Sequence, residues 1–126
     1  YGAMGRPDMA TLTSHFLNGT DGTHAGDVGV TLVRINADDQ RTKLLESRSD
    51  GDGRFRLELD IAADAPATRY ELVIDSGTYF AGRGIPQAGM TIMREIVLRF
   101  EMPDPSAQYH MPVIISPNNY STWWSS

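Results

Sequence analysis

The sequence predicts an all-β protein, a β-sandwich of eight strands with one short helix between the fifth and the sixth strand. Twelve glycines and seven prolines lie scattered between short apolar runs, which favours many turns and short strands. A chain of 126 residues with 40% hydrophobic residues suits one core and leaves too little material for a second. Two packed sheets would bury one face of each. We therefore expect residues 9–126 to form a single domain, and residues 1–8 resemble the remnant of an expression tag.

The first three predicted strands follow from apolar runs separated by polar loops. In residues 11–17, Leu12 and Phe16 lie on one face and His15 on the other, as period-two alternation requires. Residues 28–35 carry apolar side chains on both faces, which is typical of a central strand packed on two sides. After a polar turn, residues 44–48 form a third, short strand.

A glycine-rich turn connects the third strand to the fourth. The segment Ser49-Asp-Gly-Asp-Gly53 supplies glycines where a positive φ is needed. Residues 54–60 then alternate, with Phe55 and the two leucines inward and the charged residues outward. Residues 69–75 form the fifth strand.

The one predicted helix begins at Ser76 and extends to about Gly84. Ser76 can cap its first turn, Tyr79 and Phe80 would pack on a sheet, and Gly84 ends it. A helix this short is marginal alone, so its stability must come from that packing. Residues 92–100 follow as the sixth strand.

Two strands close the chain. Residues 110–116 alternate between an apolar face and a face that carries His110. The segment Ser-Pro-Asn-Asn at 116–119 has proline and asparagine where a tight turn prefers them. From Tyr120 onward, Thr122 and two tryptophans favour a strand that runs to the chain end.

Composition argues against several classes of function. The formal net charge is −5 and no Lys/Arg cluster is present, so a polyanionic partner such as nucleic acid is not expected. No apolar run approaches the ~20 residues of a membrane span. The absence of cysteine excludes disulfides, thiolate metal sites and a cysteine nucleophile. We expect a cytoplasmic protein.

The C-terminal segment is similar to the signature of the transthyretin-like family, whose enzymatic branch comprises the 5-hydroxyisourate hydrolases. The matching residues are Tyr109-His110, Pro112, Ser116-Pro117, Tyr120-Ser121-Thr122 and Ser126. The similarity is continuous from Leu12 to Ser126. It implies an eight-stranded transthyretin-like β-sandwich with one helix after its fifth strand, which agrees with the count from periodicity.

The resemblance also implies three catalytic residues, His15, Arg54 and His110. His15 lies in Leu-Thr-Ser-His-Phe-Leu-Asn, which is similar to the family's first strand, and Arg54 ends the family's Asp-Gly-Arg. His110 matches the second histidine of a His-Tyr-His triplet. From the pattern alone, His15 is more simply a surface or core-edge histidine, and for Arg54 a solvated arginine near Glu58 is an equally good interpretation. His24, in a polar loop, is assigned no role.

The sequence departs from the family pattern in the region expected to contact substrate. Gln108 replaces the first histidine of the triplet, and Trp123-Trp124-Ser125 replaces Tyr-Arg-Gly. Two indoles donate one hydrogen bond each, so the pocket should be more apolar than in the family. We expect Gln108, Trp123 and Ser126 to bind substrate. No metal or other cofactor is expected, because two histidines do not complete a metal site.

The resemblance implies hydrolytic opening of a cyclic amide in a small oxidised purine, 5-hydroxyisourate, at sites formed between the subunits of a homotetramer. One histidine would deprotonate water, the arginine would hold the oxyanion and the other histidine would protonate the leaving nitrogen. Two alternatives stay open. The chain could be a divergent paralogue that acts on another small cyclic amide or carbonyl compound in a biosynthetic pathway, or a non-catalytic carrier. Two retained histidines argue against the carrier.

Overall fold

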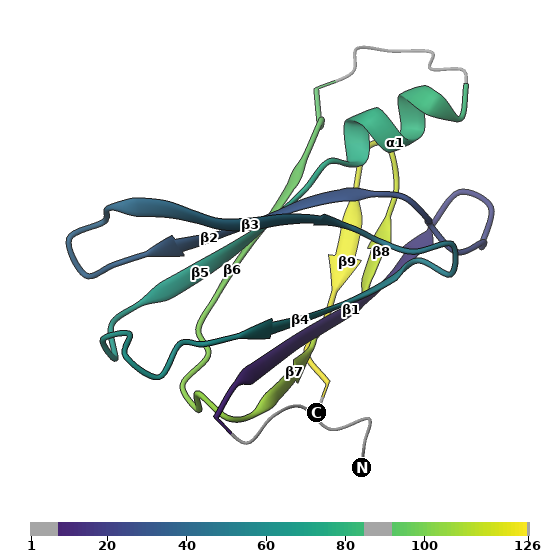
Figure 1. The fold of residues 1–126 in the computed structure, drawn as a ribbon. Coiled ribbons are helices and arrows are strands. Elements are labelled where there is room, and N and C mark those ends of the chain that lie inside the picture. The colour runs from purple at the N-terminus through teal and green to yellow at the C-terminus, as the bar shows by residue number, and fades with distance from the viewer. Residues whose placement is uncertain (1–7, 85–91, 126) are drawn as a thin grey trace.

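The computed structural model describes residues 8–84 and 92–125, which form two packed sheets with a short helix at one end (Figure 1). The all-β sandwich predicted from the sequence is confirmed, with nine strands in the described residues instead of eight. The elements are β1 (Ala10–Asn18), β2 (Gly29–Ile35), β3 (Arg41–Arg48), β4 (Arg54–Leu59), β5 (Arg69–Ile74), α1 (Ser76–Gly82), β6 (Ile96–Phe100), β7 (Gln108–His110), β8 (Val113–Ile115) and β9 (Tyr120–Thr122). Residues 1–7, which include most of the suggested tag remnant, lie outside the described part.

Strand β1 is the centre of the sheet that carries the predicted histidines. It pairs antiparallel with β4 on one side, and parallel with β7 and β8 on the other. Strand β9 continues this sheet beyond β8. The second sheet has the order β3-β2-β5-β6 and is antiparallel throughout. Because β1 has neighbours on both sides, residues from β4 and β7 flank it directly.

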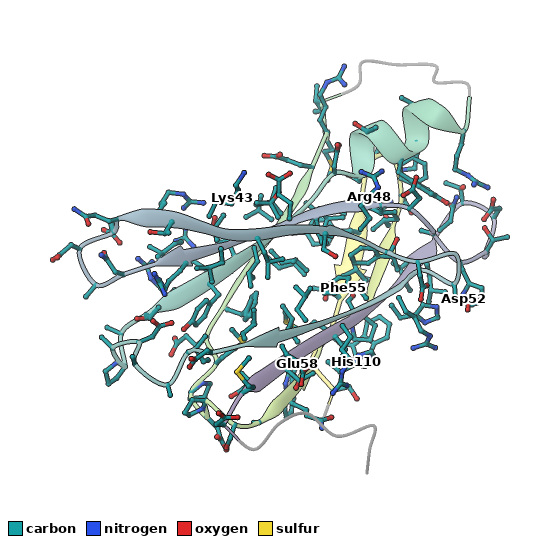
Figure 2. The ribbon with its side chains drawn as sticks, in the orientation of Figure 1. Lys43, Arg48, Asp52, Phe55, Glu58 and His110 are labelled. Atoms are coloured by element: carbon teal, nitrogen blue, oxygen red, sulfur yellow. The ribbon has the colours of Figure 1, made fainter. Side chains whose placement is uncertain are left out.

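The core lies between the two sheets, and Figure 2 shows Phe55 pointing into it from β4. Strand β4 alternates strictly, with Phe55, Leu57 and Leu59 buried and the charged residues exposed, as the sequence predicted. Phe16 on β1 contacts Phe55 edge to face, with ring centroids 5.5 Å apart. Each such side chain contributes about 1.5–3 kcal/mol when fully buried. These contacts fix which face of β1 is turned away from the core.

The predicted strand at 110–116 is wrong, because the structure divides it into β7 and β8. Pro112 lies at the break and has no N–H to donate to the neighbouring strand. Met111 still contacts β1 on both sides of its peptide unit: its N–H donates to the Thr13 carbonyl at 3.0 Å, and its carbonyl accepts from the Ser14 hydroxyl at 2.6 Å. The final strand ends at Thr122, short of the chain end that the sequence suggested.

The start of two other strands and the cap of the helix also differ from the sequence-based prediction. Strand β3 begins at Arg41, three residues before its predicted start, because polar residues there pair with the end of β2 past a bulge. Strand β6 begins at Ile96 instead of 92, since Ile96 pairs with the last residue of β5. The cap of α1 is Asp75, not Ser76: the Asp75 carboxylate accepts from the N–H of Thr78.

Strand β2 is central in its sheet, as predicted, but only one of its faces is covered. Val30, Leu32 and Ile35 are buried, whereas Thr31 and Val33 on the other side are only partly buried. The apolar character of Val33 therefore does not indicate a second packed layer. In α1, Phe80 is buried in the core and Tyr79 packs against it, so the helix rests on the sandwich as expected.

Candidate active site

The outward face of β1 presents His15. Leu12, Ser14 and Phe16 are buried, while Thr13 and His15 between them are only partly covered. This alternation follows from the two-residue period of a strand. His15 therefore points away from the core, as the sequence predicted, and its surroundings are set by the strands on either side of β1.

Arg54 lies directly beside His15, because the two residues are Cα partners in the β1–β4 ladder. A rigid turn sets this position. The Asp50 carboxylate accepts from the backbone N–H of Asp52 at 2.9 Å and of Arg54 at 3.0 Å. Gly53 adopts φ +78° and its carbonyl accepts from the N–H of Phe16 at 2.7 Å. These hydrogen bonds therefore hold the backbone at Arg54 against β1.

The carboxylate of this turn is kept ionised by the hydrogen bonds it accepts. The pKa of Asp50 is lowered, first by the backbone N–H of Arg54 and further by that of Asp52 and by the nearby charges of Arg54 and His15. Burial raises the pKa of Asp50, but this effect is smaller than the combined effect of the hydrogen bonds and charges. A negative charge therefore lies next to the guanidinium and imidazole at neutral pH.

His110 lies on the other side of β1, where it is the register partner of Thr13. Its Nδ1 is 2.8 Å from the Thr13 hydroxyl, which lies 3.5 Å from the Tyr109 carbonyl. The Thr13 hydroxyl either donates to Nδ1, which leaves the proton of a neutral ring on Nε2, or accepts from Nδ1–H; in both cases this contact leaves Nε2 open. Figure 2 shows His110 and Glu58 on the face of this sheet opposite to Phe55.

A cavity of about 400 Å³ opens on this face. Its lining includes Thr13, Arg54, Arg56, Gln108 and His110. Gln108 is exposed and two positions before His110 on β7, so it faces the same side. A larger hollow of about 650 Å³ lies against the second sheet. The described residues that line it include no histidine, so the smaller cavity is the better candidate for chemistry.

His15 has a partner that the sequence analysis did not assign. Its Nε2 lies 2.9 Å from Nδ1 of His24, with ring centroids 5.0 Å apart. The pKa of His15 is lowered, first by burial, then by the Arg54 charge and by His24, with a smaller effect of His110; a hydrogen bond with the backbone of Asp52 opposes this. His15 is therefore more readily neutral at pH 7 than a free imidazole.

The chain's last described residues return to His110. The N–H of Ser125 donates to the His110 carbonyl at 2.8 Å, and the reverse bond measures 3.3 Å. Trp123 and Trp124 are 47% and 63% exposed in the single chain. Their contact with substrate stays a prediction, and Ser126 lies outside the described residues.

Residues 8–84 and 92–125 lack two features. No group of three or more His, Asp or Glu side chains in these ranges could hold a metal ion. None of the helices there has the length and apolar character needed to cross a bilayer.

Comparisons with known proteins place this chain in a family. The HIUase/Transthyretin family matches residues 12–124. The 5-hydroxyisourate hydrolase of Ralstonia nicotianae is 32% identical over 118 residues, which cover 94% of this chain and all of the relative. The structure of Klebsiella pneumoniae 5-hydroxyisourate hydrolase has 29% identity and a TM-score of 0.69, covering 92% of this chain and 99% of that one. An (S)-allantoin synthase structure has 27% identity and a TM-score of 0.79; the match covers 94% of this chain but 44% of that longer one.

Proposed function

The chain belongs to the HIUase/Transthyretin family, and we propose that it is a hydrolase that opens a cyclic amide in a small oxidised purine, with 5-hydroxyisourate as its substrate. The observation that carries this proposal is the register of one sheet. His15 is paired with Arg54, and His110 is paired with Thr13 two residues away, so two imidazoles and one guanidinium share a face. Strand pairing, not sequence proximity, brings them together.

We assign the proton-accepting role to His15. Its lowered pKa keeps it neutral near pH 7, as a general base must be. It removes a proton from water while the water oxygen attacks the ring carbonyl. The carbonyl oxygen then carries the negative charge, and the Arg54 guanidinium beside it donates hydrogen bonds to that oxygen.

We assign the proton-donating role to His110. As the tetrahedral intermediate collapses, the bond between carbon and ring nitrogen breaks and the nitrogen takes a proton from the imidazole. Thr13 holds His110 through Nδ1 and leaves Nε2 for this transfer. The proton gained by His15 and the one lost by His110 balance, so solvent exchange restores both rings. No metal ion takes part in these steps.

The site is proposed to be complete only in a homotetramer in the cytoplasm. In the single chain the cavity is open to solvent, and the two tryptophans that precede Ser125 are exposed. Packing of a second copy on this face would cover the indoles and exclude water, which strengthens the electrostatic effect of Arg54. Gln108, Trp123 and Ser126 are proposed to contact the substrate in that enclosed site.

The first prediction concerns turnover. Freshly generated 5-hydroxyisourate should lose its absorbance faster with the protein than without it. His110→Ala and Arg54→Ala should each lower kcat/KM by about 100-fold or more, the usual range for loss of an acid–base group or an oxyanion donor. Lys43→Ala, on the exposed face of the other sheet, should match the wild type.

Two results would contradict the proposal. Equal decay with and without the protein would exclude 5-hydroxyisourate as substrate, and equal activity of the His110→Ala variant would exclude its role. Turnover of another cyclic amide with unchanged dependence on both histidines would instead support the paralogue. Binding of aromatic ligands without turnover of any of these compounds would support a carrier.

A further inference from the structure

His24 and His15 form a close pair of imidazoles. The distance of 2.9 Å between Nε2 of His15 and Nδ1 of His24 is that of an N–H···N hydrogen bond. Such a bond contains one proton between the two nitrogens, so one ring donates and the other accepts. The tautomer of one ring therefore determines the tautomer of the other.

The pairing geometry explains how a loop residue reaches His15. His24 bridges to Leu17 in antiparallel register, and two backbone hydrogen bonds flank this bridge. The Asn18 N–H donates to the Thr23 carbonyl at 2.8 Å, and the Ala25 N–H to the Phe16 carbonyl at 2.9 Å. His15 lies two residues before Leu17 on the same face. Diagonal neighbours of this kind are within reach of aromatic side chains.

Side-chain hydrogen bonds and one ion pair hold the loop that carries His24. The side-chain oxygen of Asn18, which is buried, accepts from the N–H of Thr20 at 2.8 Å and from its hydroxyl at 2.6 Å. The Asp21 carboxylate accepts in the same way from Thr23 and forms an ion pair with Arg83 of the helix end at 3.0 Å. This bonding holds the backbone before His24 in one conformation, so the imidazole is held at His15 without having to be ordered during reaction.

Charged groups on every neighbouring element influence the pair. Arg54 from β4 and His110 from β7 both oppose a positive charge on His15, and the Asp50 carboxylate in the turn before β4 favours one. If both rings were protonated, the two nitrogens that lie 2.9 Å apart would each carry a proton, so the rings would repel each other and lose their hydrogen bond. One added proton, by contrast, converts the bond to a charge-assisted N⁺–H···N, which is stronger. The arrangement therefore suits the uptake of a single proton.

We propose that His24 is the positioning residue of His15: it fixes the orientation of that imidazole through the Nε2–Nδ1 hydrogen bond, and the two rings accept one proton as a unit. This inference rests on the proposed hydrolytic function for its catalytic consequence. His15 donates Nε2–H to Nδ1 of His24 and takes the proton from water on its own Nδ1, and the added charge is shared across the bond until the proton returns to solvent. His24 supports the base, as a third group does in other base-assisted sites, but as a neutral imidazole instead of a carboxylate.

The first test is a titration of the histidine ring signals by NMR, which requires no substrate. The wild type should show two coupled steps, with the second protonation at least one pH unit below the first. In His24→Ala the signal of His15 should titrate in one step, at a higher pH than the second step of the wild type. Lys43→Ala, on the exposed face of the other sheet, should retain both steps. An unchanged His15 titration in His24→Ala would overturn the inference.

The second test is the pH dependence of turnover. Loss of one hydrogen bond of about 0.5–1.5 kcal/mol predicts a fall in kcat of about 2- to 12-fold for His24→Ala, with a smaller effect on KM. The acid limb of kcat/KM, which reports the pair in the wild type, should follow the one-step titration of His15 alone in this variant. His24→Asn can place its amide oxygen where the Nδ1 lone pair lies and accept from Nε2–H of His15, so it should recover most of kcat but not the two-step titration. A uniform loss at all pH values, with no recovery in His24→Asn, would assign His24 a structural role only and overturn the inference.

The two tests separate this inference from the proposed function. Coupled titration without any turnover of 5-hydroxyisourate would support the pair and contradict the substrate. Turnover with independent titration of the two histidines would support the function and overturn the pair.

Discussion

Thr13 contacts the second histidine of the proposed site through its hydroxyl. The side chain lies between the main-chain carbonyl of Tyr109 and Nδ1 of His110, so one small group on β1 orients a ring on β7. A free imidazole at a strand edge would sample two ring flips and two tautomers. Because proton transfer needs one defined nitrogen, this contact is expected to influence the rate more than the stability.

The prediction at this scale is the effect of Thr13→Val, which retains the shape of the side chain and removes the hydroxyl. Loss of one hydrogen bond of about 0.5–1.5 kcal/mol in the transition state corresponds to a fall in kcat of about 2- to 12-fold. Steady-state kinetics with 5-hydroxyisourate would measure it. Thr13→Ser retains the hydroxyl and should stay closer to the wild type. Equal rates for Thr13→Val and the wild type would show that His110 is oriented by other contacts.

At the scale of elements, the turn between β3 and β4 determines where Arg54 lies. Gly53 has a positive φ, and a Cβ at this position would approach the Phe16 carbonyl oxygen to 2.4 Å. The close approach is required because Phe16 donates its N–H to the Gly53 carbonyl at 2.7 Å. Glycine is therefore needed for both the turn and its contact with β1.

Gly53→Ala should destabilise the fold by about 2 kcal/mol or more, since left-handed strain of about 1–2 kcal/mol adds to the steric overlap. For a domain of this size, we expect the melting temperature to fall by roughly 6–12 °C. Gly51→Ala is the matched control, because φ is not positive there and no atom lies within 4 Å of an added Cβ. Calorimetry would compare them, and equal melting temperatures would contradict this account of the turn.

The strands of the site also show which of its residues could be placed from the sequence alone. Period-two alternation predicted which side chains of β1 and β4 face outward, so His15 and Arg54 were placed on the correct faces. It could not place His24, because a loop has no periodicity and the bridge to Leu17 depends on tertiary hydrogen bonds. A histidine two residues beyond an Asp-Gly turn was the one available signal. The break at Pro112 could have been expected from its missing N–H.

At the scale of the whole molecule, the important feature is the outer face of one sheet, on which the described residues pack no further layer. The candidate site lies on the outer face of the β4-β1-β8-β9 sheet, and the core contacts only the inner face. Trp123, Trp124 and Tyr120 at this end are exposed in the single chain. Aromatic side chains are enriched where proteins contact other proteins.

The last prediction tests whether copies of this chain pack on that face. Ser121 on β9 is exposed and is paired with Ile114, so an arginine there can point to solvent in a folded single chain. It would place a charge within a packed interface, where an unpaired charge is strongly unfavourable. Ser121→Arg should therefore keep the circular dichroism spectrum of the wild type but lose the tetramer in light scattering. Activity should fall with the assembly, by about 10-fold or more.

Thr42→Arg, at an exposed position of β3 in the other sheet, is the matched control and should retain both the tetramer and its activity. Tryptophan emission gives an independent measure, because Trp123 and Trp124 are the two tryptophans of the chain and covering them should shift their emission to shorter wavelength. Dilution of the wild type should reverse that shift and lower the specific activity together. A wild type that is monomeric at micromolar concentration and fully active would contradict the interface, and would mean that the cavity beside His110 is sufficient for catalysis without a second copy.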